Sequence, residues 1–173
     1  MVKEQIASYI VKRKLKKKLN PEISFNRLFR NAVSILIIMP GNESDFYSSK
    51  KLLKIFDEYN KDVILLTHDF RVSLLPIQFK SHVIDYGLSD ISRLQLPSRS
   101  LTEKLKQVKV NVVIDMNRDD NIFYSYSANL VNSPLRIGVK KKNSDLYYNL
   151  QFVDYIDNSE IFYENFLHFL QMF

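Results

Sequence analysis

Three nearly unbroken apolar runs constrain the fold of this 173-residue chain more than any other feature. They read VSILIIM at residues 33–39, DVILL at 62–66 and VNVVID at 110–115. A strand with one face in water alternates apolar and polar residues, whereas a strand covered on both faces is apolar throughout. The runs therefore predict a parallel sheet with helices on both of its faces.

Amphipathic segments lie between the apolar runs, as expected of crossover helices. The predicted strands are Ser34–Met39, Val63–Thr67, His82–Tyr86, Asn111–Met116 and Leu135–Val139. The predicted helices are Asp45–Tyr59, a short one at Arg71–Leu75, Ser100–Val108, Ile122–Val131 and a closing helix at Ser159–Met172. The chain is thus expected to form an α/β, doubly wound, mainly parallel Rossmann-like sheet of about five or six strands.

The N-terminal segment carries most of the charge. Residues 1–30 hold nine Lys or Arg against Glu4 and Glu22, while the whole chain has a net charge of +6, so the remainder is close to neutral. A helix is predicted over Lys3–Leu19, with an apolar stripe at every fourth position from Ala7, and Pro21 ends it. We expect a basic amphipathic helix and tether at 1–31 and one Rossmann-like domain at 32–173.

The basic helix has three candidate roles. Its cations could contact an anionic membrane surface or another anion; they are Lys12, Arg13, Lys14, Lys16, Lys17 and Lys18. They could instead bind nucleic acid, although the near-neutral domain disfavours this alternative. In the third case the apolar stripe docks on the domain and the lysines face water.

Several classes of protein are excluded by what the sequence lacks. There is no cysteine, so disulfides, thiolate nucleophiles and cysteine-bound zinc are impossible. The glycine-rich nucleotide loops and the G-x-S-x-G elbow are absent, and the three histidines have no metal-ligand spacing. We expect neither cofactor nor metal. Without a long apolar run or a leader pattern, the expected location is cytoplasmic.

Polar side chains follow four of the predicted strands. In an open parallel sheet, ligands bind beyond the carboxyl ends of the strands. The candidate ligand-binding residues there are Gly41, Asn42, Ser44, Asp45, Asp85, Asp115, Asn117 and Arg118. Asp, Asn and Ser at such positions also form turns and helix caps, and Ser44 or Asp45 is the expected cap of the helix that follows.

Residues 35–150 resemble the N-terminal, acceptor-side domain of family 9, heptosyltransferase-like glycosyltransferases of the GT-B fold. The resemblance rests on ILIIM and GNESDFYSSKKLLKIF, on LLPIQFKSHVIDYG and LKQVKVNVVIDMNRD, and on ANLVNSPLRIGVKKK ending in YYNLQF. It implies that Asp45 occupies the position of the family's catalytic base, which acts on an acceptor hydroxyl. The chain is also similar to short bacterial single-domain proteins that join a basic segment to one such domain.

The resemblance leads to two hypotheses besides nucleic-acid binding. Because the family's donor-binding domain has no counterpart in these residues, the first is a non-catalytic accessory domain, peripheral to the inner membrane. The second is a glycosyltransferase half-enzyme with Asp45 as base, completed by a separate donor-binding partner protein. A sugar or a lipid-linked acceptor is the implied ligand.

Overall fold

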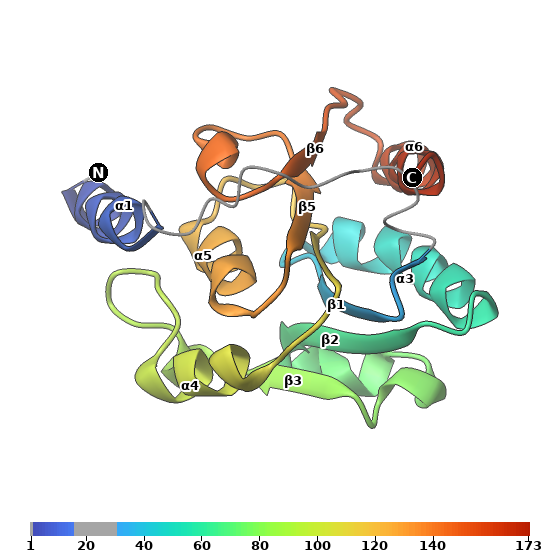
Figure 1. Cartoon of the computed structure of the whole chain (residues 1–173), viewed down its shortest axis with the longest axis horizontal. Helices are drawn as coiled ribbons and strands as arrows, with labels where there is room; N and C mark the ends of the chain where they lie inside the picture. Colours follow the sequence, from blue (N-terminus) through green and yellow to red (C-terminus); the bar gives the residue numbers. More distant parts are fainter. Residues whose placement is uncertain (1, 16–30) are drawn as a thin grey trace.

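The computed structural model of the chain describes residues 2–15 and 31–173. A six-stranded, all-parallel sheet in the order β3-β2-β1-β4-β5-β6 forms the centre of the fold (Figure 1). The strands are β1 Ser34–Ile38, β2 Asp62–His68, β3 Val83–Tyr86, β4 Val112–Asp115, β5 Leu135–Val139 and β6 Leu150–Phe152. This order confirms the predicted Rossmann-like α/β fold.

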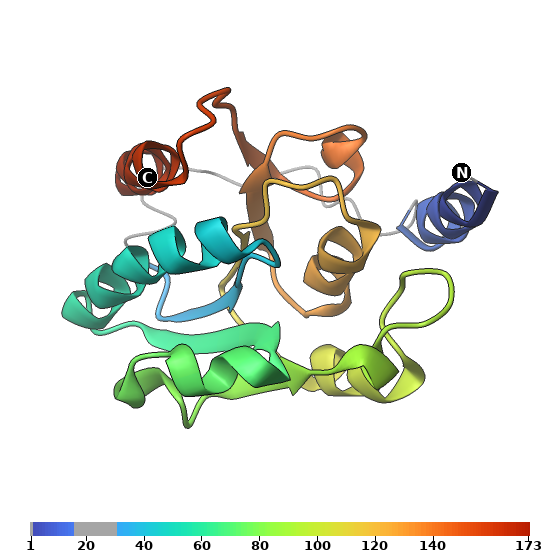
Figure 2. The same cartoon turned by 180° about the vertical axis from the view of Figure 1, so that it is seen from behind.

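Helices cover both faces of the sheet. They are α1 Val2–Leu15, α3 Glu43–Glu58, α4 Arg99–Gln107, α5 Ile122–Leu130 and α6 Ser159–Gln171. Helices α3 and α6 lie side by side on one face, and α4, α5 and α1 lie on the other (Figures 1 and 2). The predicted short helix after β2 is a 3₁₀ segment, Asp69–Leu74.

The central strand shows why the apolar runs are unbroken. Ile35 and Ile37 of β1 belong to the core under α3 and α6, and Leu36 and Ile38 belong to the core under α4 and α5. All four side chains are completely buried. Each apolar residue of β1 therefore packs against a helical layer, because successive side chains of a strand point to opposite faces.

The apolar stripe of α1 packs against the domain. Ala7, Val11 and Leu15 are buried in the same core as α4 and α5. The ammonium group of Lys14 lies 5.8 Å from the centre of the Tyr126 ring of α5. Of the predicted anion contacts, Lys12 is half-buried and Arg13 and Lys14 are exposed, while Lys16, Lys17 and Lys18 lie outside the described residues.

The closing helix α6 joins the core through a cluster of aromatic rings. Phe152 of β6 contacts Phe162, Phe166 and Phe169, with ring centres 5.2–5.3 Å apart. The predicted closing helix therefore packs on the sheet through its aromatic face. Among the residues that the structure describes, no helix has both the length and the apolar character that crossing a bilayer requires.

Candidate functional site

The order of strands reverses between β1 and β4, which places the topological switch point at their carboxyl ends. The two loops beyond these strands are joined by hydrogen bonds. The Gly41 amide donates to Asn117 Oδ1 at 2.8 Å, and Asn117 Nδ2 donates to the Met39 carbonyl at 3.3 Å. Asn117 thus fixes the first loop relative to β4.

Two further side chains hold the loop after β1. The Arg71 guanidinium donates to the carbonyls of Pro40 and Gly41 at 2.5 and 2.8 Å. Tyr124 of α5 approaches Gly41 so closely that a β-carbon at this position would overlap its hydroxyl oxygen. A side chain at this position therefore requires the tip of Tyr124 to move, and the loop is held by contacts from both Arg71 and α5.

Asp45, the predicted catalytic base, lies in the first turn of α3 and is only 5% exposed. Its Oδ1 accepts a hydrogen bond from Ser159 Oγ at 2.7 Å and from the Arg118 guanidinium at 3.4 Å. The cap of the helix is Asn42, whose Oδ1 accepts from the Asp45 amide, so the prediction of Ser44 or Asp45 as cap was wrong. The Asp45 side chain does not cap α3 and instead contacts Ser159 of α6.

Arg118, the ion-pair partner of Asp45, is held by several further contacts. Its guanidinium donates to the carbonyls of Ile156 and Asp157 at 2.6 and 3.1 Å, and it lies 4.5 Å from the centre of the Phe162 ring. Asp45, Arg118, Asn42 and Ser44 all line one open hollow of about 520 Å³. Both of these contacts fall on Oδ1, so Oδ2 is the oxygen with which Asp45 could accept a proton from a substrate in this hollow.

Asp115 lies beneath the rim, completely buried. Its Oδ1 accepts from the amide and the side chain of Asn117, at 2.9 and 2.8 Å. Its Oδ2 accepts from the Tyr148 hydroxyl and, at 3.4 Å, from the ammonium group of Lys141, itself only 3% exposed. Burial, and secondly the charge of Asp115, raises the pKa of Tyr148, so the phenol stays a donor. This network joins the ends of β4 and β5 to the segment that leads into β6.

The predicted rim residues therefore do not form one site. Asn42, Ser44, Asp45 and Arg118 share a hollow, whereas Gly41, Asp115 and Asn117 connect the strand ends internally. Asp85 is exposed on β3 and lines neither of the two hollows at this edge of the sheet.

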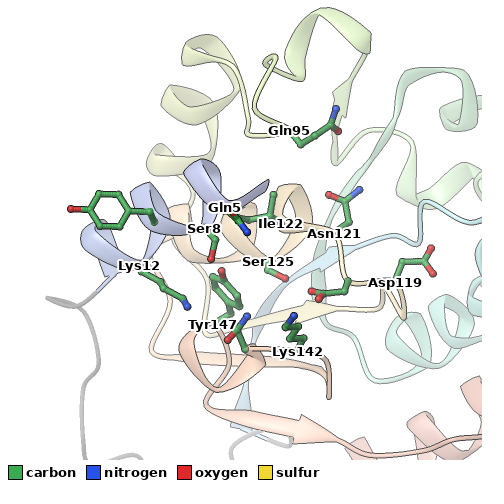
Figure 3. Close-up of a pocket in the computed structure, with 13 residues that line it drawn as sticks. Gln5, Ser8, Lys12, Gln95, Asp119, Asn121, Ile122, Ser125, Lys142 and Tyr147 are labelled. Carbon is green, nitrogen blue, oxygen red and sulfur yellow. The ribbon is translucent and has the colours of Figure 1, made fainter. Parts of the chain in front are cut away.

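A larger groove of about 1010 Å³ lies beside the rim, between α1 and the domain (Figure 3). Its walls come from α1, the loop before α4, the start of α5 and the loop after β5. The lining residues are Gln5, Ser8, Tyr9, Lys12, Gln95, Asp119, Asp120, Asn121, Ile122, Ser125, Lys142, Asn143 and Tyr147. Only Lys12 among the predicted site residues contributes to it.

The groove is lined by polar and apolar surface in about equal parts and holds side chains of both charges. Burial, and to a lesser extent the charge of Asp120, raises the pKa of Tyr147, which keeps the phenol protonated as a hydrogen-bond donor. Asn121 caps α5 through its Oδ1, which accepts from the Phe123 amide at 2.9 Å. Within residues 2–15 and 31–173, no group of three acidic or histidine side chains could hold a metal ion.

No protein-family model, curated protein or solved structure matches this chain. What is established is the parallel α/β fold with its six strands. A parallel sheet of this kind supports many unrelated activities, so the function has to be argued from the two hollows.

Proposed function

We propose that this chain is a non-catalytic accessory domain, related to the acceptor-binding domain of family 9 glycosyltransferases, that binds a sugar-containing ligand at the carboxyl edge of its sheet. One observation carries the non-catalytic part. The Asp45 side chain, at the position of the family's base, is nearly buried, and its Oδ1 holds both Ser159 of α6 and Arg118, which favours a structural role. Its Oδ2 is the oxygen that keeps lone pairs for a substrate hydroxyl, and the burial of the side chain restricts access to it.

The groove beside α1 is the candidate ligand site because its size and lining suit a sugar. A volume of about 1010 Å³ is in the upper range of small-molecule sites. Side-chain amides donate and accept at once, carboxylates accept, and phenols present a flat apolar face with one polar tip. Gln95, Asp120 and Tyr147 supply one example of each group, and these complement vicinal hydroxyls on a hydrocarbon ring.

Titration of the full chain with methyl glycosides of hexoses and heptoses, followed by NMR, tests this proposal. We expect shifts at the groove and an affinity loss of about tenfold in Asp120→Asn, since a hydrogen bond to a charged group contributes about 1.5–3 kcal/mol. Asp85→Asn, an exposed carboxylate outside both hollows, is the matched control. Absence of binding by every glycoside contradicts the proposal.

The alternative is a glycosyltransferase half-enzyme that acts with a separate donor-binding partner protein. Its support is the open hollow of about 520 Å³ in which Asp45 lies beside Arg118. The two functions differ in the behaviour of Asp45→Asn. We expect this variant to bind glycosides as the parent does. Sugar transfer by the parent chain together with a donor-domain protein, lost in Asp45→Asn, contradicts the accessory role.

Attachment to the inner membrane surface is a separate part of the proposal. Since Ala7, Val11 and Leu15 are buried against the domain, the attraction has to be electrostatic, through exposed cations such as Arg13 and Lys14. Each cation near an anionic leaflet contributes about 1 kcal/mol. We expect cosedimentation with phosphatidylglycerol vesicles, and none with phosphatidylcholine vesicles. A salt-sensitive gel shift with nucleic acid, without vesicle binding, favours the nucleic-acid alternative instead.

A further inference from the structure

Two lysines in the groove beside α1 have no ionic partner among the described residues. They are Lys12 of α1 and Lys142 of the loop after β5. Figure 3 shows them on either side of Tyr147, with Asp119 on the side away from Lys12. One groove thus holds two cations and two carboxylates, Asp119 and Asp120, that form no ion pairs with one another.

The two lysines that precede Lys142 both form ion pairs with carboxylates. Lys140 lies 2.8 Å from the Asp145 carboxylate, and Lys141 lies 3.4 Å from that of Asp115. Lys142 is the member of the KKK run that extends into the groove without such a partner. A cation that forms no ion pair attracts an anion more strongly in a concave site than on a convex surface.

We infer that the groove binds a phosphate-bearing ligand, with the phosphate group between Lys12 and Lys142 and the hydroxyl-bearing part toward Asp119 and Asp120. Two ammonium groups give a phosphate compact positive charges and six N–H donors. Tyr147 lies between the lysines in Figure 3, where its phenol can donate a further hydrogen bond. The carboxylates disfavour an anion at their own end, so they orient the ligand along the groove.

This inference rests on the proposed function only in taking the groove as the ligand site. The phosphate can belong to a soluble sugar phosphate or to the headgroup of phosphatidic acid, since both present a phosphomonoester. Lys12 comes from α1 and Lys142 from the domain, so the phosphate site is complete only when α1 is docked through Ala7 and Val11.

The test compares a hexose, its 6-phosphate and inorganic phosphate as ligands of the full chain in low salt. We expect the 6-phosphate to bind at least tenfold more tightly than the hexose, and Lys12→Gln and Lys142→Gln each to remove most of this advantage. Lys104→Gln and Lys106→Gln, two exposed lysines of α4, change the net charge equally and should leave it intact.

The outcomes separate the two proposals. Equal affinity for hexose and hexose 6-phosphate overturns the phosphate site and leaves the sugar-binding function standing. Phosphate binding that depends on Lys12 and Lys142, without sugar binding, supports the phosphate site and overturns the sugar-binding function. Equal loss in the α4 variants overturns the inference, because the effect is then one of net charge.

Vesicles identify the source of the phosphate. If it is a lipid headgroup, phosphatidic acid vesicles bind the parent chain and the Lys12→Gln/Lys142→Gln double variant loses that binding. If it is a soluble phosphate, the double variant loses the sugar phosphate but keeps any vesicle binding. Retention of both ligands by the double variant overturns the inference.

Discussion

Ser159 donates a hydrogen bond to the carboxylate of Asp45 at 2.7 Å across 114 positions of sequence, and so joins the first turn of α6 to the first turn of α3. The same carboxylate oxygen accepts from Arg118, which also holds the carbonyls of Ile156 and Asp157. The candidate base of a transferase is thus part of the contact that closes the fold.

Arg118→Gln should therefore destabilise the protein. It leaves the nearly buried Asp45 charge without its cationic partner, and we expect the free energy of unfolding in urea to fall by about 2 kcal/mol. Adding Asp45→Asn removes the unpaired charge and should restore part of this loss. If Arg118→Gln unfolds at the urea concentration of the parent, the ion pair has no structural role.

Gly41→Ala tests the close approach of Tyr124 to the loop after β1. The new methyl group overlaps the Tyr124 hydroxyl, and overpacking of this kind costs about 1–3 kcal/mol. Tyr124→Phe removes the overlapping oxygen, so we expect the double variant to lose less stability than the sum of the single variants. Thermal unfolding measures both effects. Strict additivity contradicts direct contact.

Because several phenols are buried, we expect these tyrosines to ionise at a higher pH than free tyrosine. Burial raises the pKa of Tyr86, Tyr124, Tyr147, Tyr148 and Tyr163 above the ordinary value. Since the unfolded chain ionises these groups near pH 10 and the folded chain does not, stability is present below pH 10 and falls as the pH rises beyond it.

Absorbance at 295 nm measures this titration. In the folded protein, the signal of these five among the ten tyrosines should develop only together with loss of structure. The same protein in urea, where all phenols are exposed, is the control. Complete ionisation of all ten in a protein that is still folded contradicts the assigned burial.

Val11→Asp tests the docking of α1. A charge at this fully buried position cannot stay in the core, so we expect α1 to detach while the sheet remains folded. Trypsin should then cut after Lys12 and Arg13 faster, and ligand binding in the groove should be lost. Ile6→Asp, at a position 45% exposed on the same helix, is the control. Equal protease resistance of Val11→Asp and the parent contradicts the docked arrangement.

The helices and strands that were predicted correctly are those with a clear pattern of apolar residues within their own segment of sequence. β1 and β4 were found because both of their faces are buried, which leaves an apolar run. β6 was not predicted as a strand, because Leu150–Phe152 is too short for a pattern. The helix cap was wrong because Asn42, Ser44 and Asp45 are all good caps, and only the backbone geometry selects among them.

The candidate sites depended on contacts that no local pattern contains. Asp45 could be found from its place after β1, but its partner Ser159 lies in the last helix. The groove beside α1 was missed because its walls come from four segments that are far apart in the sequence. The lysine run at 140–142 was a visible signal, yet its members differ: Lys141 is buried against Asp115, and Lys142 reaches the groove.

The burial of the Asp115 carboxylate also has a consequence for folding during synthesis. It sits at the end of β4, yet Lys141 and Tyr148, which neutralise and hydrogen-bond it, are translated later. A nascent chain that has emerged only as far as β4 would have to bury this charge alone, which costs several kcal/mol. We therefore expect the sheet to close over Asp115 only after about thirty more residues have been added, at roughly 5–20 per second, because these carry Lys141 and Tyr148.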